Sequence, residues 1–300
     1  MEGGAATNAF RTPEERFKGL PDFDFEPHYR EVDGLRLAHL DVGEGPPLLM
    51  IHGEPTWSFV WRKTIPPLVD AGYRCIAVDL AGCGRSDKPS DLGWYTLERH
   101  TDLTHRLLVD LDLRDVTMVL HDWGGTIGLT LTSQEEERIA RVVILDTALD
   151  ASALWMSERW VEFREFVEQT EDLPAGEMMR GSLYNEPTDE VIAGYDAPYL
   201  GPESKVSLRA LPLLVEKTDR TPEGAATVIE ALRKDPRPFR IIWGQEDLIL
   251  TAPTAERFAA SIGHQVDEWI PEAGHGIPED QGELLGERIA AWLREVAPSS

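Results

Sequence analysis

A single aspartate stands where an apolar run gives way to glycines. Met118-Val119-Leu120-His121 precedes Asp122, and Trp123-Gly124-Gly125 follows it. This order predicts a buried strand that turns at once into a helix beginning near Thr126. Such a turn displays a nucleophile, most often serine, at the end of a sheet. An aspartate that opens a helix is also a common helix cap, so this motif alone leaves both interpretations open.

Two later residues could complete a catalytic set with Asp122. Asp247 follows the strand-like run Phe239–Trp243, and His275 follows the next predicted strand. The chain order nucleophile, acid, histidine is that of a triad built on an open sheet. Asp247 could instead cap the helix predicted over Thr251–Ala260, and His275 could be an ordinary loop histidine. Three such coincidences at strand ends together favour a triad.

The loop after the first buried strand is placed to stabilise negative charge. It reads His52-Gly53-Glu54-Pro55, and Pro55 fits a turn just before a helix. Backbone N–H groups beside a nucleophile can form an oxyanion hole. We therefore expect the N–H groups of Glu54 and Trp123 to form this hole.

Short apolar runs alternate with helix-like segments along most of the chain, which indicates a mostly parallel sheet flanked by helices. Asp33-Gly34 lies between two early half-buried segments and predicts a hairpin. The hairpin strands are expected over His28–Val32 and Leu35–Val42. The buried strands are expected over Leu48–His52, Cys75–Asp79, Val116–His121, Val142–Asp146, Phe239–Trp243 and Gln265–Ile270.

The alternation stops between residues 151 and 221, a region rich in charge, proline and tryptophan. Helix-like pieces such as Ser157–Gln169 and Lys205–Val215 lie within it. Unstructured loops of this length are rare inside compact domains, so a helical cap domain is favoured over a long surface excursion. The predicted main domain then consists of residues 1–150 and 222–300.

Five segments of the chain resemble haloalkane dehalogenases, in particular those with H-G-E-P in the first loop. The resemblance covers nearly the whole chain, closely in the main domain and loosely in the cap. It implies the α/β-hydrolase fold with an inserted helical cap, and a hydrolase that acts on small haloalkanes. The segments are Arg11–Phe17, His52–Ser58, Gly84–Pro89, Tyr95–His100 and Asp122–Gly125.

The resemblance also implies a role for each candidate residue. Asp122 attacks the carbon and forms an alkyl ester, His275 then activates water as the general base, and Asp247 orients His275. The indole N–H of Trp123 holds the departing halide. A carboxylate suits this chemistry because it is ionised at neutral pH and displaces halide in line, whereas a saturated carbon has no carbonyl for a serine to attack. The products are an alcohol, halide and a proton.

A second indole donor usually comes from the cap in this subfamily, and here the sequence departs from the pattern. The expected position holds Phe163, which has no N–H. Trp160 lies one helical turn earlier on about the same face and could replace it, as could Trp155. Both tryptophans could equally serve only in packing.

Two other functions compete with dehalogenation. An epoxide hydrolase shares the fold and the aspartate nucleophile, and it would polarise the epoxide with cap tyrosines such as Tyr184, Tyr195 or Tyr199. The H-G-E-P loop and the N-terminal match favour dehalogenation. A catalytically silent ligand receptor on this fold would have no need of a complete triad.

Composition restricts the partners and the compartment. The net charge of −25 disfavours binding to nucleic acid or to anionic membrane surfaces, and no run of about 18 apolar residues is available to cross a membrane. The only cysteines, Cys75 and Cys83, make no disulfide framework, so a reduced cytoplasm is expected. The chemistry requires no organic cofactor, and the histidines have no metal-ligand spacing. We expect a monomer or a weak homodimer.

Overall fold

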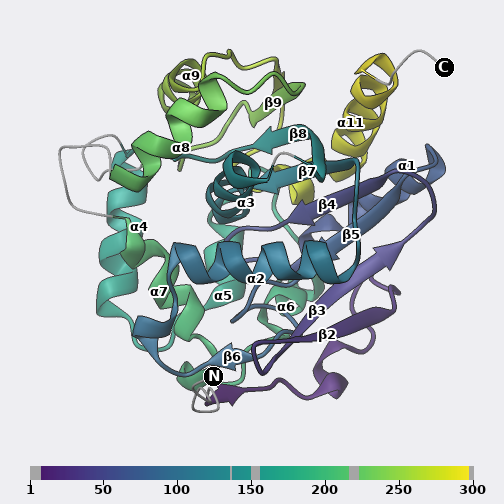
Figure 1. Ribbon diagram of the computed structural model, residues 1–300. Helices are drawn as coiled ribbons and strands as arrows, with labels where there is room; N and C mark the ends of the chain where they lie inside the picture. The colour runs from purple at the N-terminus through teal and green to yellow at the C-terminus, as the bar shows by residue number, and fades with distance from the viewer. Residues whose placement is uncertain (1–7, 136, 150–155, 216–222, 297–300) are drawn as a thin grey trace.

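An eight-stranded sheet forms the centre of the fold (Figure 1). The computed structural model describes residues 8–135, 137–149, 156–215 and 223–296. Strand order is β10-β9-β8-β7-β4-β5-β3-β2, parallel from β10 to β5, with β3 and β2 each antiparallel to the preceding neighbour. These strands are β2 (Pro27–Val32), β3 (Leu35–Val42), β4 (Pro47–Ile51), β5 (Arg74–Val78), β7 (Val116–His121), β8 (Ile139–Leu145), β9 (Phe239–Gly244) and β10 (Glu268–Ile270). A small second sheet pairs β1 (Ala9–Phe10) with β6 (Lys88–Pro89).

The strands follow the predicted pattern, but two of them start three residues away from the predicted position. β8 begins at Ile139, before the predicted Val142. The β2–β3 hairpin is confirmed, with Asp33 and Gly34 both at positive φ (50° and 76°), as a tight hairpin turn requires. The last strand was predicted over Gln265–Ile270, but β10 begins only at Glu268. The reason is that the Asp267 carboxylate, rather than a backbone carbonyl, accepts the N–H of Ile241 at 2.8 Å.

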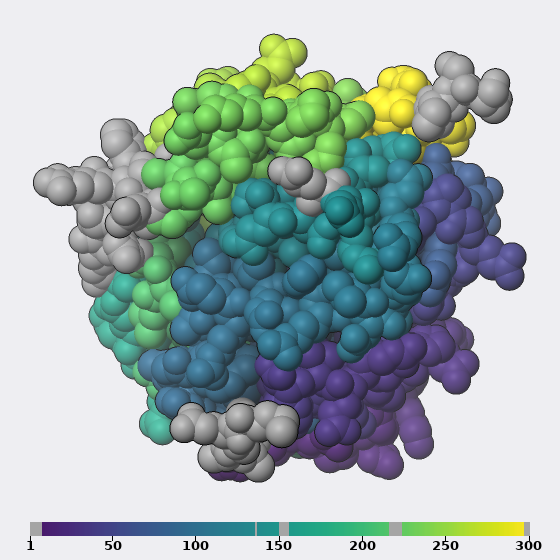
Figure 2. Space-filling view, viewed as in Figure 1, coloured from purple at the N-terminus to yellow at the C-terminus, as the bar shows by residue number. Residues whose placement is uncertain are grey.

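Helices connect the strands and cover the sheet. On the face seen in Figure 1, α2 lies in front of the sheet, and it packs on α3, which packs on α8, while α1 packs on α11. Figure 2 shows this face covered by the side chains of α2 (blue) and α8 (green). The helices around the sheet are α1 (Ile65–Asp70), α2 (Leu97–Asp110), α3 (Trp123–Gln134), α8 (Glu223–Arg233), α9 (Ala252–Ser261), α10 (Ile277–Asp280) and α11 (Gly282–Val296). Short 3-10 helices are η1 (Glu14–Phe17), η2 (Ser58–Lys63) and η3 (Leu92–Trp94).

The chain between β8 and α8 forms a separate group of helices. They are α4 (Glu158–Gln169), α5 (Ala175–Arg180), α6 (Asp189–Asp196), η4 (Pro202–Ser204) and α7 (Val206–Leu214). The group has a small apolar cluster of its own, with Val167, Leu173 and Leu208 buried at its centre. The predicted cap limits, residues 151 and 221, lie outside the described residues.

Buried polar contacts join these helices to α10 and to the segment around η2. Tyr195 on α6 donates its hydroxyl to Glu279 on α10 at 2.5 Å, and Glu279 forms a buried ion pair with Arg62 on η2. The indole N–H of Trp57 donates to the carbonyl of Gly194 at 3.1 Å. Within the described ranges, no helix is both long enough and apolar enough to span a lipid bilayer.

Candidate active site

Asp122 makes the turn from β7 to α3 in a single residue. Its backbone has φ 51° and ψ −121°, a conformation that side-chain-bearing residues rarely adopt and that concentrates at functional sites. The predicted helix start near Thr126 is wrong, because one strained residue completes the turn and α3 begins at Trp123. The Asp122 carboxylate makes no capping hydrogen bond to α3, so the helix-cap alternative is not supported.

Two glycines allow the neighbouring loop to lie directly against this turn. A Cβ on Gly53 would lie 2.1 Å from Oδ1 of Asp122, and a Cβ on Gly124 would lie 2.1 Å from the carbonyl oxygen of Ile51. Any side chain at either position would push the β4 loop away from the aspartate. This close approach places the N–H of Glu54 on Asp122.

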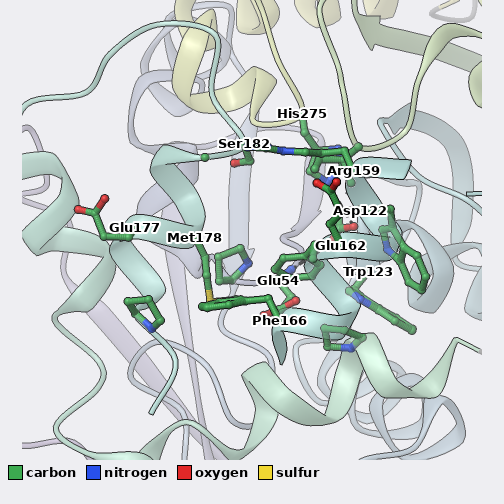
Figure 3. A pocket seen from close by; sticks show the side chains of 17 residues that line it. Glu54, Asp122, Trp123, Arg159, Glu162, Phe166, Glu177, Met178, Ser182 and His275 are labelled. Atoms are coloured by element: carbon green, nitrogen blue, oxygen red, sulfur yellow. Dashed lines mark hydrogen bonds and ion pairs between the residues drawn. The ribbon is translucent and has the colours of Figure 1, made fainter. Parts of the chain in front are cut away.

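The structure brings the predicted residues into one chain of contacts (Figure 3). The backbone N–H of Glu54 donates to Oδ1 of Asp122 at 2.8 Å. Oδ2 of Asp122 lies 3.4 Å from Nε2 of His275, and Nδ1 of His275 lies 2.9 Å from Oδ2 of Asp247. These residues follow β4, β7, β9 and β10, whose carboxyl ends meet at one edge because the strands are parallel.

Asp247 is fixed by the turn that contains it. Its Oδ1 accepts the N–H groups of Ile249 at 2.7 Å and Leu250 at 2.9 Å, which leaves Oδ2 for His275. The N-cap residue of α9 is Thr251, so Asp247 does not cap that helix. The side chain therefore has one orientation, directed at the histidine.

Opposite charges stabilise the ionised forms of Asp122 and His275. Burial alone would raise the pKa of Asp122, but the hydrogen bond and charge of His275 outweigh burial and hold this pKa below its usual value. Burial alone would lower the pKa of His275, but the charge of Asp247 and the contact with Asp122 hold it well above its usual value. Asp122 is therefore an anion in the free protein, and His275 a cation beside it.

A cavity of about 330 Å³ opens over the Asp122 carboxylate, near the lower end of the usual range for ligand pockets. Figure 3 shows Glu54, Asp122 and Trp123 gathered at one end and Glu177 and Met178 toward the other. Its walls also include Trp160, Phe163, Phe166, Pro174, Pro212, Ile249 and His275. The lining is mostly apolar, as a site for an uncharged small molecule requires.

Two of the candidate halide donors line this cavity. Trp123 and Trp160 both line it, and no described residue accepts a hydrogen bond from either indole N–H. Phe163, at the expected donor position, lines it as well but has no N–H to offer. Trp155 lies outside the described residues. A second cavity between α2, α3 and α8 meets the first at Asp122, Trp123 and Trp160.

None of the three cap tyrosines lines the cavity over Asp122. Tyr195 is buried and bound to Glu279, Tyr199 is buried elsewhere in the cap, and Tyr184 is 53% exposed. An epoxide hydrolase of the kind considered above needs tyrosine hydroxyls that face the substrate. The geometry of these side chains does not provide them.

Sequence reasoning missed two polar residues beside the triad. Asp146, directly after β8, is fully buried and accepts the N–H of Gly244 at 3.0 Å. Burial and the nearby charge of Asp247 raise its pKa well above the usual value, so this carboxyl holds its proton to a higher pH than a free aspartate does. His121 Nε2 contacts the carbonyl oxygen of His275 at 2.8 Å. Both residues stand at the end of an apolar strand or directly after it, and this position in the sequence could have identified them.

Comparison with known proteins agrees with this geometry. Residues 46–281 match the family model of the alpha/beta hydrolase fold. The chain is 37% identical to a haloalkane dehalogenase from Mycolicibacterium paratuberculosis and 38% identical to haloalkane dehalogenase 1 from Mycobacterium tuberculosis. Each match covers 95% of this chain and 98% of the relative. The chain belongs to the haloalkane dehalogenase family.

A solved structure supports the same assignment. The haloalkane dehalogenase DpaA from Paraglaciecola agarilytica is 29% identical and superposes with a TM-score of 0.86, covering 98% of this chain and 100% of DpaA. The protein is therefore a hydrolase that acts on carbon–halogen bonds of small haloalkanes, on an α/β-hydrolase fold with a mostly parallel sheet flanked by helices. These relatives and this structure support dehalogenation, and they give no better support to epoxide hydrolysis.

Proposed function

We propose that this haloalkane dehalogenase works through a covalent alkyl ester on Asp122, with His275 and Asp247 completing the triad. One observation carries the proposal. A single carboxylate contacts a backbone N–H through Oδ1 and a histidine through Oδ2, and an aspartate holds the far side of that histidine. Each oxygen of Asp122 then has a different task.

In the first step, Oδ2 of Asp122 attacks the carbon that bears the halogen. Its new bond to carbon forms while the carbon–halogen bond breaks and the bonding electrons leave with the halide. Oδ1 keeps its hydrogen bond from Glu54 and becomes the carbonyl oxygen of the ester. The halide departs toward the cavity wall, where the indole N–H of Trp123 stabilises its developing charge.

In the second step, the ester is hydrolysed. The ester has lost the negative charge of Asp122, which is one cause of the raised His275 pKa, so this pKa falls once the ester has formed and His275 releases its proton to solvent. Nε2 of His275 takes a proton from water, and the water oxygen adds to Cγ of Asp122. The N–H groups of Glu54 and Trp123 stabilise the oxyanion at Oδ1. The bond between Cγ and the alkyl oxygen then breaks, and the alcohol leaves with the proton that His275 took from water. The carboxyl that remains gives its own proton to His275, which restores the Asp122 carboxylate.

Trp160 is the cap residue that we propose as a second halide donor, since its side chain lines the cavity together with Trp123. Trp155 stays an alternative from the sequence alone. Substrate, water and halide are the expected partners of this site, and its chemistry uses no organic cofactor or metal.

We also propose that residues 151–221 form a cap domain over a main domain of residues 1–150 and 222–300. The apolar cluster within α4, α5 and α7 supports this division. A cytoplasmic location fits the two buried free cysteines, Cys75 and Cys83. We propose a monomer or weak homodimer, although DpaA is described as a tetramer. Light scattering during size-exclusion chromatography distinguishes these states.

The experiment for the proposed site compares three substrates. Bromide release from 1,2-dibromoethane and 1-bromobutane is expected, with no diol from styrene oxide. Asp122→Asn, which lacks the ionised attacker, is expected to release no bromide. Diol from styrene oxide, or sustained bromide release by Asp122→Asn, would contradict the proposal.

A further inference from the structure

In the mechanism above, only the backbone N–H of Glu54 takes part, and its side chain has no role. The residue is only 8% exposed, and its side chain lines the cavity at the same end as Asp122 and Trp123 (Figure 3). Oε1 is buried and has no hydrogen-bond partner among the described residues. A carboxyl group in this position needs a partner that the protein itself does not supply.

The groups around Glu54 determine its charge. Burial, and then the negative charge of Asp122, raise its pKa well above the usual value, and His275 lowers it by less. Cys83 and Tyr199 interact electrostatically with Glu54, and both are neutral because burial raises their pKa values. The other charged groups of the cavity, on α4 and α5, are the exposed Arg159, Glu162 and Glu177. No described cation pairs with Glu54, so its carboxyl keeps its proton.

We propose that the neutral Glu54 carboxyl donates its O–H to the departing halide, as a further donor beside the indole N–H groups of Trp123 and Trp160. The inference rests on the covalent mechanism proposed above. The geometry supports it, because the Glu54 carboxyl, whose Oε1 is unpaired, and the Trp123 indole share one end of the cavity. The hydrogen bond strengthens as negative charge builds on the halogen, so it favours the transition state over the bound haloalkane.

The donor role requires no proton transfer. Halide is a far weaker base than carboxylate, so the proton remains on Glu54 throughout, and the electron balance of the displacement is unchanged. Loss of that proton would replace a donor with an anion beside the halide and beside Asp122. Halide binding is therefore expected to weaken as pH rises through the raised pKa of Glu54.

Two substitutions separate this role from the backbone role. Both Glu54→Gln and Glu54→Met keep the backbone N–H that contacts Asp122, but only glutamine retains a side-chain hydrogen-bond donor. Bromide affinity is read from quenching of tryptophan fluorescence across a range of pH in a His275→Phe background, so that titration of His275 does not contribute to the profile. The rate of ester formation is read as the single-turnover bromide burst from 1-bromobutane in a His275→Phe background. Glu165→Met, which removes an exposed carboxylate from α4 outside both cavities, is the control.

We expect Glu54→Met to weaken bromide affinity and to slow the burst by about 10- to 100-fold, the effect of losing one hydrogen bond to an anion. Glu54→Gln loses less and no longer shows weaker binding at alkaline pH. Glu165→Met behaves like the unsubstituted enzyme, since exposed charges contribute little.

Three results would overturn the proposal: unchanged bromide affinity in Glu54→Met, an alkaline loss of affinity that persists in Glu54→Gln, or a normal burst in Glu54→Met together with slow steady-state turnover of this variant when His275 is intact. The last result would assign Glu54 to the water instead. If His275→Phe shows no burst while Glu54 is intact, the covalent mechanism fails, and the bromide affinities alone decide the role of Glu54. The glutamine variant is nearly isosteric, so its pH profile remains decisive if Glu54→Met does not fold.

Discussion

Trp123→Phe removes one indole N–H and keeps an aromatic ring in the cavity wall. No described residue accepts a hydrogen bond from that N–H, so the substitution breaks no internal contact of this kind and the fold should survive. A hydrogen bond to a charged group contributes about 1.5–3 kcal/mol. The expected loss is therefore about 10- to 150-fold in bromide affinity and in the rate of ester formation, because the halide carries its charge in both cases.

The assay is bromide titration followed by tryptophan fluorescence, combined with single-turnover bromide release. Trp269→Phe is a matched control, since Trp269 lies on β10 and lines neither cavity, so it corrects for the lost fluorophore. Circular dichroism verifies the fold of both variants. If Trp123→Phe binds bromide as tightly as Trp269→Phe and forms the ester equally fast, Trp123 is not the halide donor.

Three further predictions concern substitutions of single side chains. Trp160→Phe lowers bromide affinity while Trp155→Phe does not, and equal effects of the two in the same titration would refute this assignment. Glu279→Gln leaves the buried charge of Arg62 without its partner and lowers the free energy of unfolding by about 3–5 kcal/mol, measured by denaturant titration, and a loss below about 1 kcal/mol would contradict it. Asp146 has a raised pKa in the folded state, so its contribution to stability is complete below its unfolded pKa of about 3.9 and declines as pH rises toward the folded pKa. Thermal unfolding should therefore show Asp146→Asn gaining stability over the unsubstituted protein as pH rises, by at most about 1.4 kcal/mol per pH unit, whereas a constant difference would exclude this titration.

The sequence identifies the reacting groups because their chemistry depends on residue type and on position at strand ends. Asp122, Asp247 and His275 each follow an apolar run, and parallel strands bring such positions together. The hairpin around Asp33-Gly34 was predictable for a local reason, since both residues accept positive φ. These inferences need only the order of residues along the chain.

Features that depend on burial from several segments were not predictable in this way. The start of α3 depends on the backbone strain at Asp122, which no residue pattern encodes. Tyr195 looked available for catalysis, but its hydroxyl is bound to Glu279, more than eighty residues later in the chain. The raised pKa of Asp146 likewise depends on Asp247, a residue on a different strand end.

The most direct test of the covalent mechanism uses His275→Phe, because His275 has no essential part in forming the ester and a necessary part in hydrolysing it. A burst of about one halide per active site is expected, followed by almost no turnover. Intact-protein mass should then rise by the alkyl group of the substrate, and peptide mapping should place the added mass on Asp122. Slow, steady halide release from His275→Phe with unmodified Asp122 would contradict the mechanism.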